Sequence, residues 1–157
     1  MDIYICYHYT QGLHNDALIL KQTLSDFTIH LISYNEINIY QDEPNNIAKD
    51  NIVIFLEHIN QNYLDCKIVI FFPNYEYLTK SDINLMYSNV DLVCCKTKCT
   101  KRYIETVIQI DAKKVIYTGF SSINKFLETD NKQNGFLHVK GVSNMKNTEV
   151  LINTWLK

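Results

Sequence analysis

The sequence predicts an α/β fold built on an open, mostly parallel sheet with helices on both faces. Continuous apolar runs such as residues 52–56 and 67–72 lack the alternation of a half-exposed strand. Such runs are typical of strands buried on both faces, as in parallel sheets. Helical patterns separate these runs along the chain. With 4 Gly and 2 Pro in 157 residues, a loop-rich all-β architecture is disfavoured.

Six short apolar segments are the expected strands. They lie at residues 3–9, 29–33, 52–56, 67–72, 90–95 and 115–117. The link between the third and the fourth strand, residues 57–66, leaves room for about two turns of helix. This length is near the lower limit for a parallel crossover, so the link is the weakest connection of the predicted sheet.

Three helices are expected between the strands, each begun by a residue whose side chain can accept a hydrogen bond from the first turn. They are residues 15–27, capped by Asn15 or Asp16 after a loop at residues 10–14, residues 81–88, capped by Ser81, and residues 100–110, capped by Thr100. Apolar residues recur at helical spacing in the first and third of these segments, which gives each a face to bury against the sheet.

A polar stretch near the end of the sequence predicts a domain boundary. Residues 129–135 contain no apolar side chain and indicate a linker after a first lobe at residues 1–128. Residues 136–157 then predict a strand at 136–139 and a helix from Asn147 onward, with Leu151, Ile152 and Trp155 facing inward. This β-α unit is either the start of a second, truncated lobe or an addition to the first sheet.

Charge and hydropathy exclude two classes of partner. The chain has 15 Lys and Arg against 17 Asp and Glu, so no basic excess favours nucleic acid. No apolar run reaches the ~18 residues that a membrane span requires. The first residues also lack the basic segment of a signal peptide, and we expect a cytoplasmic protein.

The cysteine pattern fits a reducing compartment. The five residues are Cys6, Cys66, Cys94, Cys95 and Cys99. An odd number without C-x2-C pairs favours buried, inert thiols over disulfides or a metal site. A Cys/His nucleophile pair is the less favoured interpretation.

Polar groups follow most of the predicted strands. If the strands are parallel, these groups share the edge where open α/β sheets bind ligands. The mixture of carboxylates, lysines, histidines, an amide and a glycine suits a hydroxyl-rich ligand; the alternative is that polar residues merely end buried strands. No G-x-G-x-x-G fingerprint, P-loop or G-x-S-x-G elbow is present.

Several of these strand ends succeed one another in a familiar order. The segments are 55–57, 72–77, 90–98, 115–122, 136–141 and 146–149. Their succession resembles the amino-terminal half of GT-B-fold glycosyltransferases of the large retaining group that uses nucleotide sugars. The resemblance covers most of the chain. It implies two Rossmann-like lobes across a cleft, with the acceptor on the amino-terminal lobe and the nucleotide sugar on the other.

The resemblance also implies roles for individual residues. Gly12, Gly141 and Lys146 would contact the donor diphosphate. The cleft would be lined by Glu57, Asn74, Glu76, Lys96, Thr97 and Gly119. The nucleotide sugar would be a co-substrate, and neither a metal nor another cofactor is expected. No catalytic residue is assigned; His8 and His14 are the nearest candidates for a base by position.

The chain departs from the family in three ways. Val142 stands where a second basic residue is usual, and Tyr77 stands where a Trp is usual. The acidic Glu-x7-Glu segment that grips the donor sugar has no counterpart, so an incomplete donor site is expected.

Three functions follow from these patterns. The first is the acceptor-side lobe of an enzyme that transfers a sugar from a nucleotide sugar to a hydroxyl acceptor. The second is an inactive binding or interaction lobe derived from such an enzyme, which pairs with a second copy or with a separate donor-lobe chain. The third, an unrelated small α/β hydrolase or nucleotide binder, is disfavoured by the missing motifs.

Overall fold

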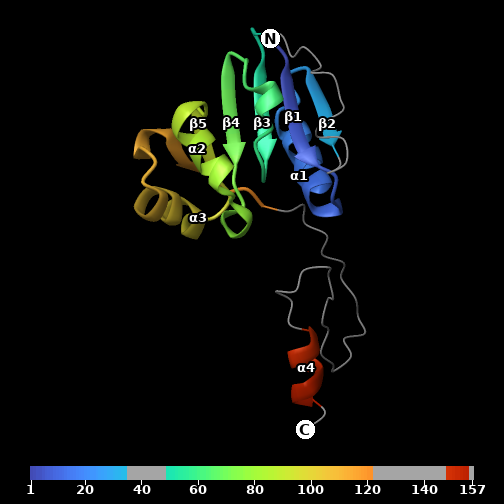
Figure 1. Cartoon of the computed structure of the whole chain (residues 1–157). Coiled ribbons are helices and arrows are strands. Elements are labelled where there is room, and N and C mark those ends of the chain that lie inside the picture. Colours follow the sequence, from blue (N-terminus) through green and yellow to red (C-terminus); the bar gives the residue numbers. More distant parts are fainter. Residues whose placement is uncertain (35–48, 122–147, 156–157) are drawn as a thin grey trace. The chain divides into compact units, whose positions relative to one another are not determined.

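The computed structural model describes residues 1–34, 49–121 and 148–155. The chain divides into two compact units, Met1–Ile123 and Asn124–Lys157. The first unit contains the sheet, and the second contains one described helix, α4 (Thr148–Trp155) (Figure 1). No helix among the described residues has both the length and the apolar character to cross a membrane.

The first unit is built on a six-stranded sheet in which every pairing is parallel. Its strands are β1 (Ile3–His8), β2 (Ile29–Tyr34), β3 (Ile52–Leu56), β4 (Ile68–Phe72), β5 (Leu92–Cys95) and β6 (Val115–Tyr117). Their order across the sheet is β2-β1-β3-β4-β5-β6. The predicted α/β class, with an open Rossmann-like sheet, is confirmed.

The central strands are apolar along their whole length because both of their faces are covered. One face of the sheet packs against α1 (Gln11–Thr23), whose Leu13, Ala17 and Leu20 join Ile5 of β1 in one core. The other face packs against α2 (Lys80–Ser88) and α3 (Lys98–Tyr103). In that second core, Phe55 and Phe71 are fully buried with Met86 and Ile104. Helices therefore cover both faces, as predicted.

The short link between β3 and β4 does make a parallel crossover. It does so with one 3₁₀ turn, η1 (Gln61–Tyr63), instead of an α-helix. Tyr63 from this turn is buried in the core beside α2 and α3. Further 3₁₀ turns, η2 (Tyr75–Tyr77) and η4 (Ala112–Lys114), lie before α2 and β6.

All three predicted helix caps were late, by two to six residues, because the structure uses an earlier threonine as the cap each time. Thr10 caps α1, so the predicted loop at residues 10–14 is wrong and Gly12 lies in the first helical turn. Thr79 caps α2 and forms a capping box with Asp82. Thr97 caps α3. A threonine in extended backbone accepts from the first turn as well as Asn or Ser does, so the sequence offered competing starts.

The first and third helices also end differently from the prediction. Helix α1 stops at Thr23, short of Phe27. The α-helical turns of α3 end at Tyr103 and continue as a π-helical segment, η3 (Ile104–Ile108), which closes at Gln109 with φ 63°. The widened turn keeps Ile104 buried while it brings the chain to the left-handed exit.

The strand order fixes where a ligand site belongs. The chain adds β2 on one side of β1 and then adds β3 to β6 on the other side. The direction of winding therefore reverses between β1 and β3. In open α/β sheets, ligands bind at the carboxyl ends of the strands beside such a reversal. In Figure 1 this edge carries the strand arrowheads.

The predictions for the last part of the chain are tested only in part. The linker at 129–135 and the strand at 136–139 lie outside the described residues, as does Asn147. The helix is present as α4. Ile152 is 50% exposed, so the expectation that it faces inward was wrong. The side chains of Leu151 and Trp155 lie outside the described part.

Candidate functional site: a strand-end pocket beside a histidine cavity

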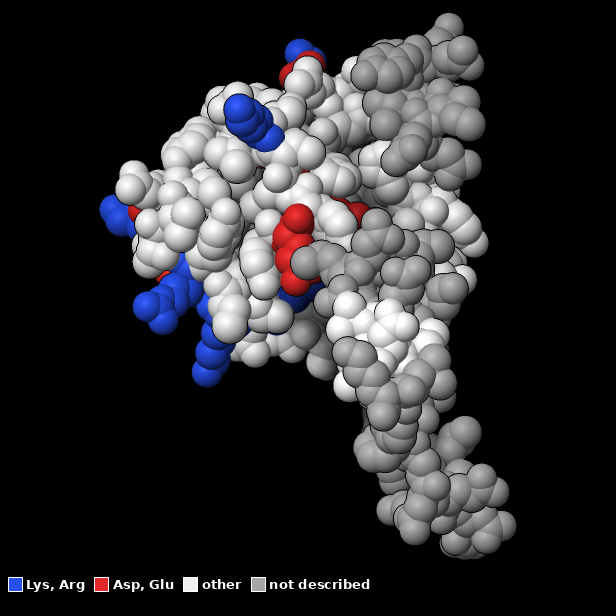
Figure 2. All heavy atoms as spheres, turned by 60° about the horizontal axis from the view of Figure 1, so that its bottom comes forward, with Lys and Arg blue, Asp and Glu red and all other residues white. Residues whose placement is uncertain are grey.

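A pocket of about 400 Å³ opens at the carboxyl ends of β3, β4 and β5, next to the start of α1. We call it the strand-end pocket. It is lined by Thr10, Gly12, Leu13, Asp16, Glu57, Phe72, Asn74, Tyr77 and Lys96. Figure 2 brings this edge forward and shows acidic atoms in the middle of the face with basic atoms beside them. Glu57, Asn74 and Lys96, predicted from three separate strand ends, therefore share one pocket.

The backbone at Glu57 is strained. Glu57 has φ 74°, in the left-handed region that side chains other than glycine rarely adopt. The amide of His58 donates to the carbonyl of Leu56 at 3.0 Å, which closes a three-residue γ-turn around Glu57. The amide of Glu57 donates to the carbonyl of Phe72 and so still pairs with β4. Strain of this kind clusters at functional sites because the turn aims a side chain where a regular strand would not.

Two polar pairs cross the pocket. The amide Nδ2 of Asn74 donates to Oε1 of Glu57 at 3.3 Å. The ammonium of Lys96 donates to a carboxylate oxygen of Asp16 on α1 and forms an ion pair with it. With Glu57 as the second carboxylate, the charged lining contributed by the described residues comprises two anions and one cation. The pocket is thus polar and slightly acidic.

The start of α1 forms one wall. Thr10 accepts from the amide of Leu13 at 3.2 Å, which orients the first turn toward the strand ends. A Cβ added at Gly12 would meet no atom within 4 Å, so the backbone there faces open space. Amide groups of a helix start, aided by the helix dipole, attract negatively charged or oxygen-rich groups.

Gly119 adjoins the pocket but does not line it. It has φ 65° just after β6 and turns the chain toward Phe120. The Phe120 ring contacts Phe72 edge to face, with ring centroids 6.2 Å apart, and Lys96 lies over it at 5.3 Å. Gly119 therefore brings Phe120 against two residues of the pocket wall.

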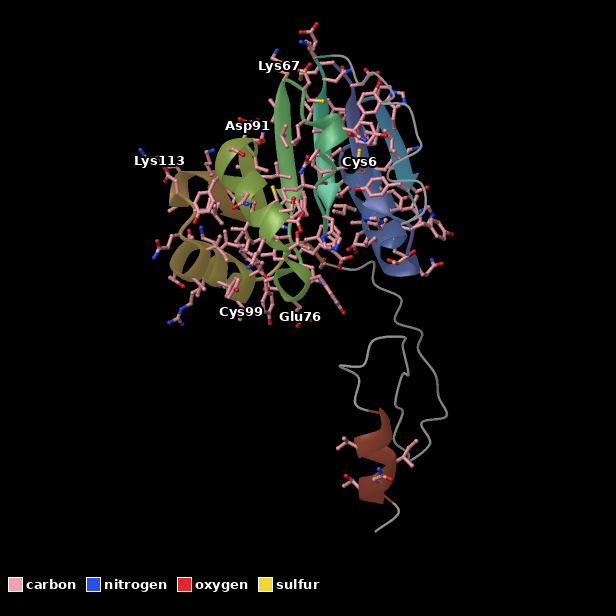
Figure 3. The ribbon with its side chains drawn as sticks, viewed as in Figure 1. Cys6, Lys67, Glu76, Asp91, Cys99 and Lys113 are labelled. Carbon is pink, nitrogen blue, oxygen red and sulfur yellow. The ribbon has the colours of Figure 1, made fainter. Side chains whose placement is uncertain are left out.

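The other predicted site residues fall elsewhere. Glu76 is exposed at the same end of the sheet, as Figure 3 shows, but is not part of the lining. Thr97 is occupied as a helix cap and accepts from the amide of Thr100 at 3.0 Å. The ring Nδ1 of His14 pairs with the hydroxyl of Tyr7 at 2.7 Å, and His14 does not line the strand-end pocket. Gly141 and Lys146 lie outside the described residues.

A second cavity, of about 510 Å³, lies beside the ends of β1, β2 and β3 near the start of α2. We call it the histidine cavity. It is lined by His8, Tyr34, His58, Ile59, Asn60, Gln61, Asn62, Thr79, Ser81 and Asp82. The ring centroids of His8 and His58 are 5.8 Å apart. The γ-turn thus sends two consecutive residues, Glu57 and His58, into two different cavities.

A buried carboxylate holds His58 in place. Asp82, 3% exposed, accepts from Nδ1 of His58 at 3.0 Å and from the amide of Ile59 at 2.9 Å. The same carboxylate accepts from the hydroxyl of Thr79 at 2.6 Å. The hydrogen bond to Asp82 raises the pKa of His58, against the opposing effect of burial. Burial raises the pKa of Asp82, but the bonds from His58, Thr79 and Ile59 outweigh it and lower the pKa overall.

The cysteines only partly follow the prediction. Cys6, Cys94 and Cys95 are buried, and none of the five forms a disulfide. Burial raises the pKa of Cys94 to about 12 and that of Cys95 to about 11, which makes these thiols inert. Cys99 is exposed at the start of α3, so the prediction of burial was wrong there. Within the described ranges, no cluster of His, Cys, Asp or Glu suits a metal ion.

Comparison with protein-family models, curated proteins and solved structures found no match.

Three of the residues that shape these cavities had no predicted role in the site. Asp16 was considered only as a helix cap, and its approach to Lys96 joins positions 80 residues apart, which no local pattern reveals. Asp82 had a usable signal, because Thr79-x-x-Asp82 is a capping-box pattern. His58 was seen as one of several polar residues at strand ends, but its partner on α2 depends on packing.

Proposed function

We propose that the chain is the acceptor-side lobe of a glycosyltransferase that transfers a sugar from a nucleotide sugar to a hydroxyl acceptor. The observation that carries the proposal is the convergence of Glu57, Asn74 and Lys96 on one pocket with the start of α1. These three were singled out by a resemblance to such enzymes. Their meeting at one strand-end pocket is the arrangement that the proposal requires.

The lining of the strand-end pocket suits a sugar ring. Carboxylates accept hydrogen bonds from hydroxyl groups, and the amide of Asn74 and the ammonium of Lys96 donate to ring and hydroxyl oxygens. Phe72 and Tyr77 offer apolar surface to the C–H face of the ring. A volume of about 400 Å³ is within the usual range for small-molecule sites and admits a monosaccharide unit.

The charge of the pocket favours the acceptor over the diphosphate. Asp16 and Glu57 outnumber Lys96, and the ion pair already neutralises the lysine. A diphosphate would bind more readily at the open backbone of Gly12, at the positive end of α1. The proposal assigns the rest of the donor site to a second lobe, on the same polypeptide or on a separate chain. The proposal includes a cytoplasmic location, which the free thiols of the consecutive residues Cys94 and Cys95 support.

A binding lobe without transferase activity is the second candidate. Among the described residues, no imidazole lines the strand-end pocket, and its lysine and amide are each engaged by a neighbouring carboxylate. The proton acceptors of the described lining are the carboxylates of Asp16 and Glu57, and each is paired with the lysine or the amide, an arrangement that is equipped to hold a ligand.

Calorimetric titration of the full chain with methyl glycosides and with UDP- and GDP-sugars tests the proposal. Glu57→Gln keeps the shape of the side chain and removes a charged acceptor, so we expect about tenfold weaker sugar binding. Glu76→Gln is the matched control, since Glu76 is exposed at the same edge but does not line the pocket. Equal effects of the two substitutions, or no sugar binding by the native chain, would contradict the proposal. Release of UDP or GDP in the presence of a bound acceptor would select transfer over binding alone.

A further inference from the structure

The histidine cavity contains a proton acceptor that the proposed function does not use. Nδ1 of His58 donates to Asp82, which fixes the ring and assigns the lone pair of the neutral imidazole to Nε2. Nε2 has no hydrogen-bond partner in the described part of the chain. Over the same residues, no side-chain nitrogen or oxygen is both buried and unpartnered. Nε2 is therefore open to the cavity.

Among the described residues, the remaining lining of the cavity carries no exposed carboxylate and no Lys or Arg, which contrasts with the strand-end pocket. Asp82, the one carboxylate of this described lining, is buried, and its two oxygens accept bonds from His58, Ile59 and Thr79. Apart from the imidazoles of His8 and His58, the other polar side chains are uncharged amides and hydroxyls, namely those of Asn60, Gln61, Asn62, Thr79, Ser81 and Tyr34. A cationic ligand would meet no exposed carboxylate of the described lining and an anion would meet only the two imidazoles, whereas an uncharged ligand would find donors and acceptors.

We propose that the histidine cavity is a second ligand site, which binds an uncharged polyhydroxy compound with one ligand hydroxyl donating to Nε2 of His58. The side-chain amides of Asn60 and Asn62 also line the cavity, where they can pair with other hydroxyls of the ligand. The volume of about 510 Å³ accommodates a sugar-sized molecule. This site is separate from the strand-end pocket and stands whether or not the chain belongs to a transferase.

Protonation provides a test with a definite sign. A hydroxyl that donates to Nε2 binds only the neutral imidazole, so a saturating ligand lowers the pKa of His58 by linkage. An anion would bind the imidazolium and raise that pKa. Among the described residues, the titratable groups that face His58 are Asp82 on α2, His8 on β1, Tyr34 on β2 and Glu57, which precedes His58 in the chain. Because His8 is the other imidazole of the cavity, the measurement is repeated in His8→Gln.

The experiment follows the imidazole ¹H–¹⁵N signals of His58 in the full chain during titration with methyl α-D-glucopyranoside or inorganic phosphate. We expect the glycoside to move the Nε2 signal and to lower the pKa of His58, and phosphate to do neither. No change with the glycoside, or a pKa raised by phosphate, would overturn the proposal.

Two substitutions localise the binding. His58→Asn keeps a donor near the position of Nδ1 for Asp82 but removes Nε2, and should weaken glycoside binding about tenfold. Asn62→Ala removes an exposed lining amide that caps nothing, and should weaken binding about threefold if His58→Asn fails to fold. His14→Asn, outside the cavity, is the control and should bind as the native chain does. Unchanged affinity in the first two variants would refute the site. Lys96→Met distinguishes binding at the histidine cavity from binding at the strand-end pocket, since the His58 signal should still respond to the glycoside in this variant.

Discussion

The positive φ of Glu57 in the γ-turn leads to a prediction about the stability of two variants at this position. Glu57→Gly and Glu57→Ala remove the same carboxylate and the same bond from Asn74. They differ only in the Cβ, which a residue with φ 74° accommodates poorly. We therefore expect Glu57→Gly to be the more stable variant of the two.

The size of the difference follows from two opposing contributions. The left-handed conformation costs a residue with a Cβ about 1–2 kcal/mol. Glycine loses about 0.5–1 kcal/mol more backbone entropy on folding than alanine. The difference leaves Glu57→Gly more stable than Glu57→Ala by about 0.5–1 kcal/mol, or roughly 1–4 °C in Tm for a chain of this length. At a position with ordinary negative φ, the entropy contribution stands alone and the alanine variant is the more stable.

Urea and thermal unfolding of the paired variants measure this difference. Gln109 is the positive control, since it is exposed and has φ 63°, so its glycine variant should also exceed its alanine variant. Gln22, exposed in α1, is the negative control, where alanine should exceed glycine by up to about 1 kcal/mol. If Glu57→Ala equals or exceeds Glu57→Gly while both controls behave as expected, the γ-turn is not strained and the reasoning fails.

Three further predictions concern other parts of the first unit. Gly119→Ala should lower the free energy of unfolding by about 1 kcal/mol, because Gly119 has φ 65°. Gly12→Ala should not lower it, since the added Cβ meets no atom within 4 Å. Equal unfolding midpoints for the two variants would contradict this prediction. Because the pKa of His58 is raised in the folded chain, protonated His58 stabilises the fold. This contribution to the free energy of unfolding is fully present below about pH 6.5, the pKa of an unperturbed histidine, and is lost as pH rises through the raised pKa of the folded state. The lowered pKa of Asp82 contributes stability that is present above about pH 3.8 and is lost as pH falls through the lowered value. Because the contribution of His58 is lost as pH rises, the unfolding free energies of His58→Asn and of the native chain should approach each other between pH 5 and pH 9; a constant gap over that range would refute the linkage. One thiol, that of Cys99, should react rapidly with a disulfide reagent in the native protein, and fast reaction of several thiols would contradict the described burial.

The fold was predictable because its signals are local. Strand β3 was predicted with its observed ends, since Ile52–Leu56 is a continuous apolar run and both of its faces are covered. The parallel direction followed from the same feature. Helix starts were less accurate, because several residues near each start can cap and only the fold selects one. Thr97 and Thr100 show this, as both are hydroxyl residues and their side chains hydrogen-bond each other.

The candidate site was predictable only as an edge of the sheet. Parallel strands placed Glu57, Asn74 and Lys96 at the same edge, and they meet in one pocket. The division of that edge into two cavities was not predictable, because it depends on a positive φ at Glu57, a residue type that gives no warning of such a conformation. The Asp82 carboxylate under His58 likewise depends on how α2 packs against the end of β3.

Amide chemical-shift mapping of the full chain with a nucleotide sugar and with a methyl glycoside tests the central claim most directly. Sugar binding should perturb the amides of Gly12, Glu57 and Asn74 together, and these changes should be lost in Glu57→Gln but kept in Glu76→Gln. Shifts confined to other surfaces, or no shifts with either ligand, would contradict a sugar site at the strand-end pocket.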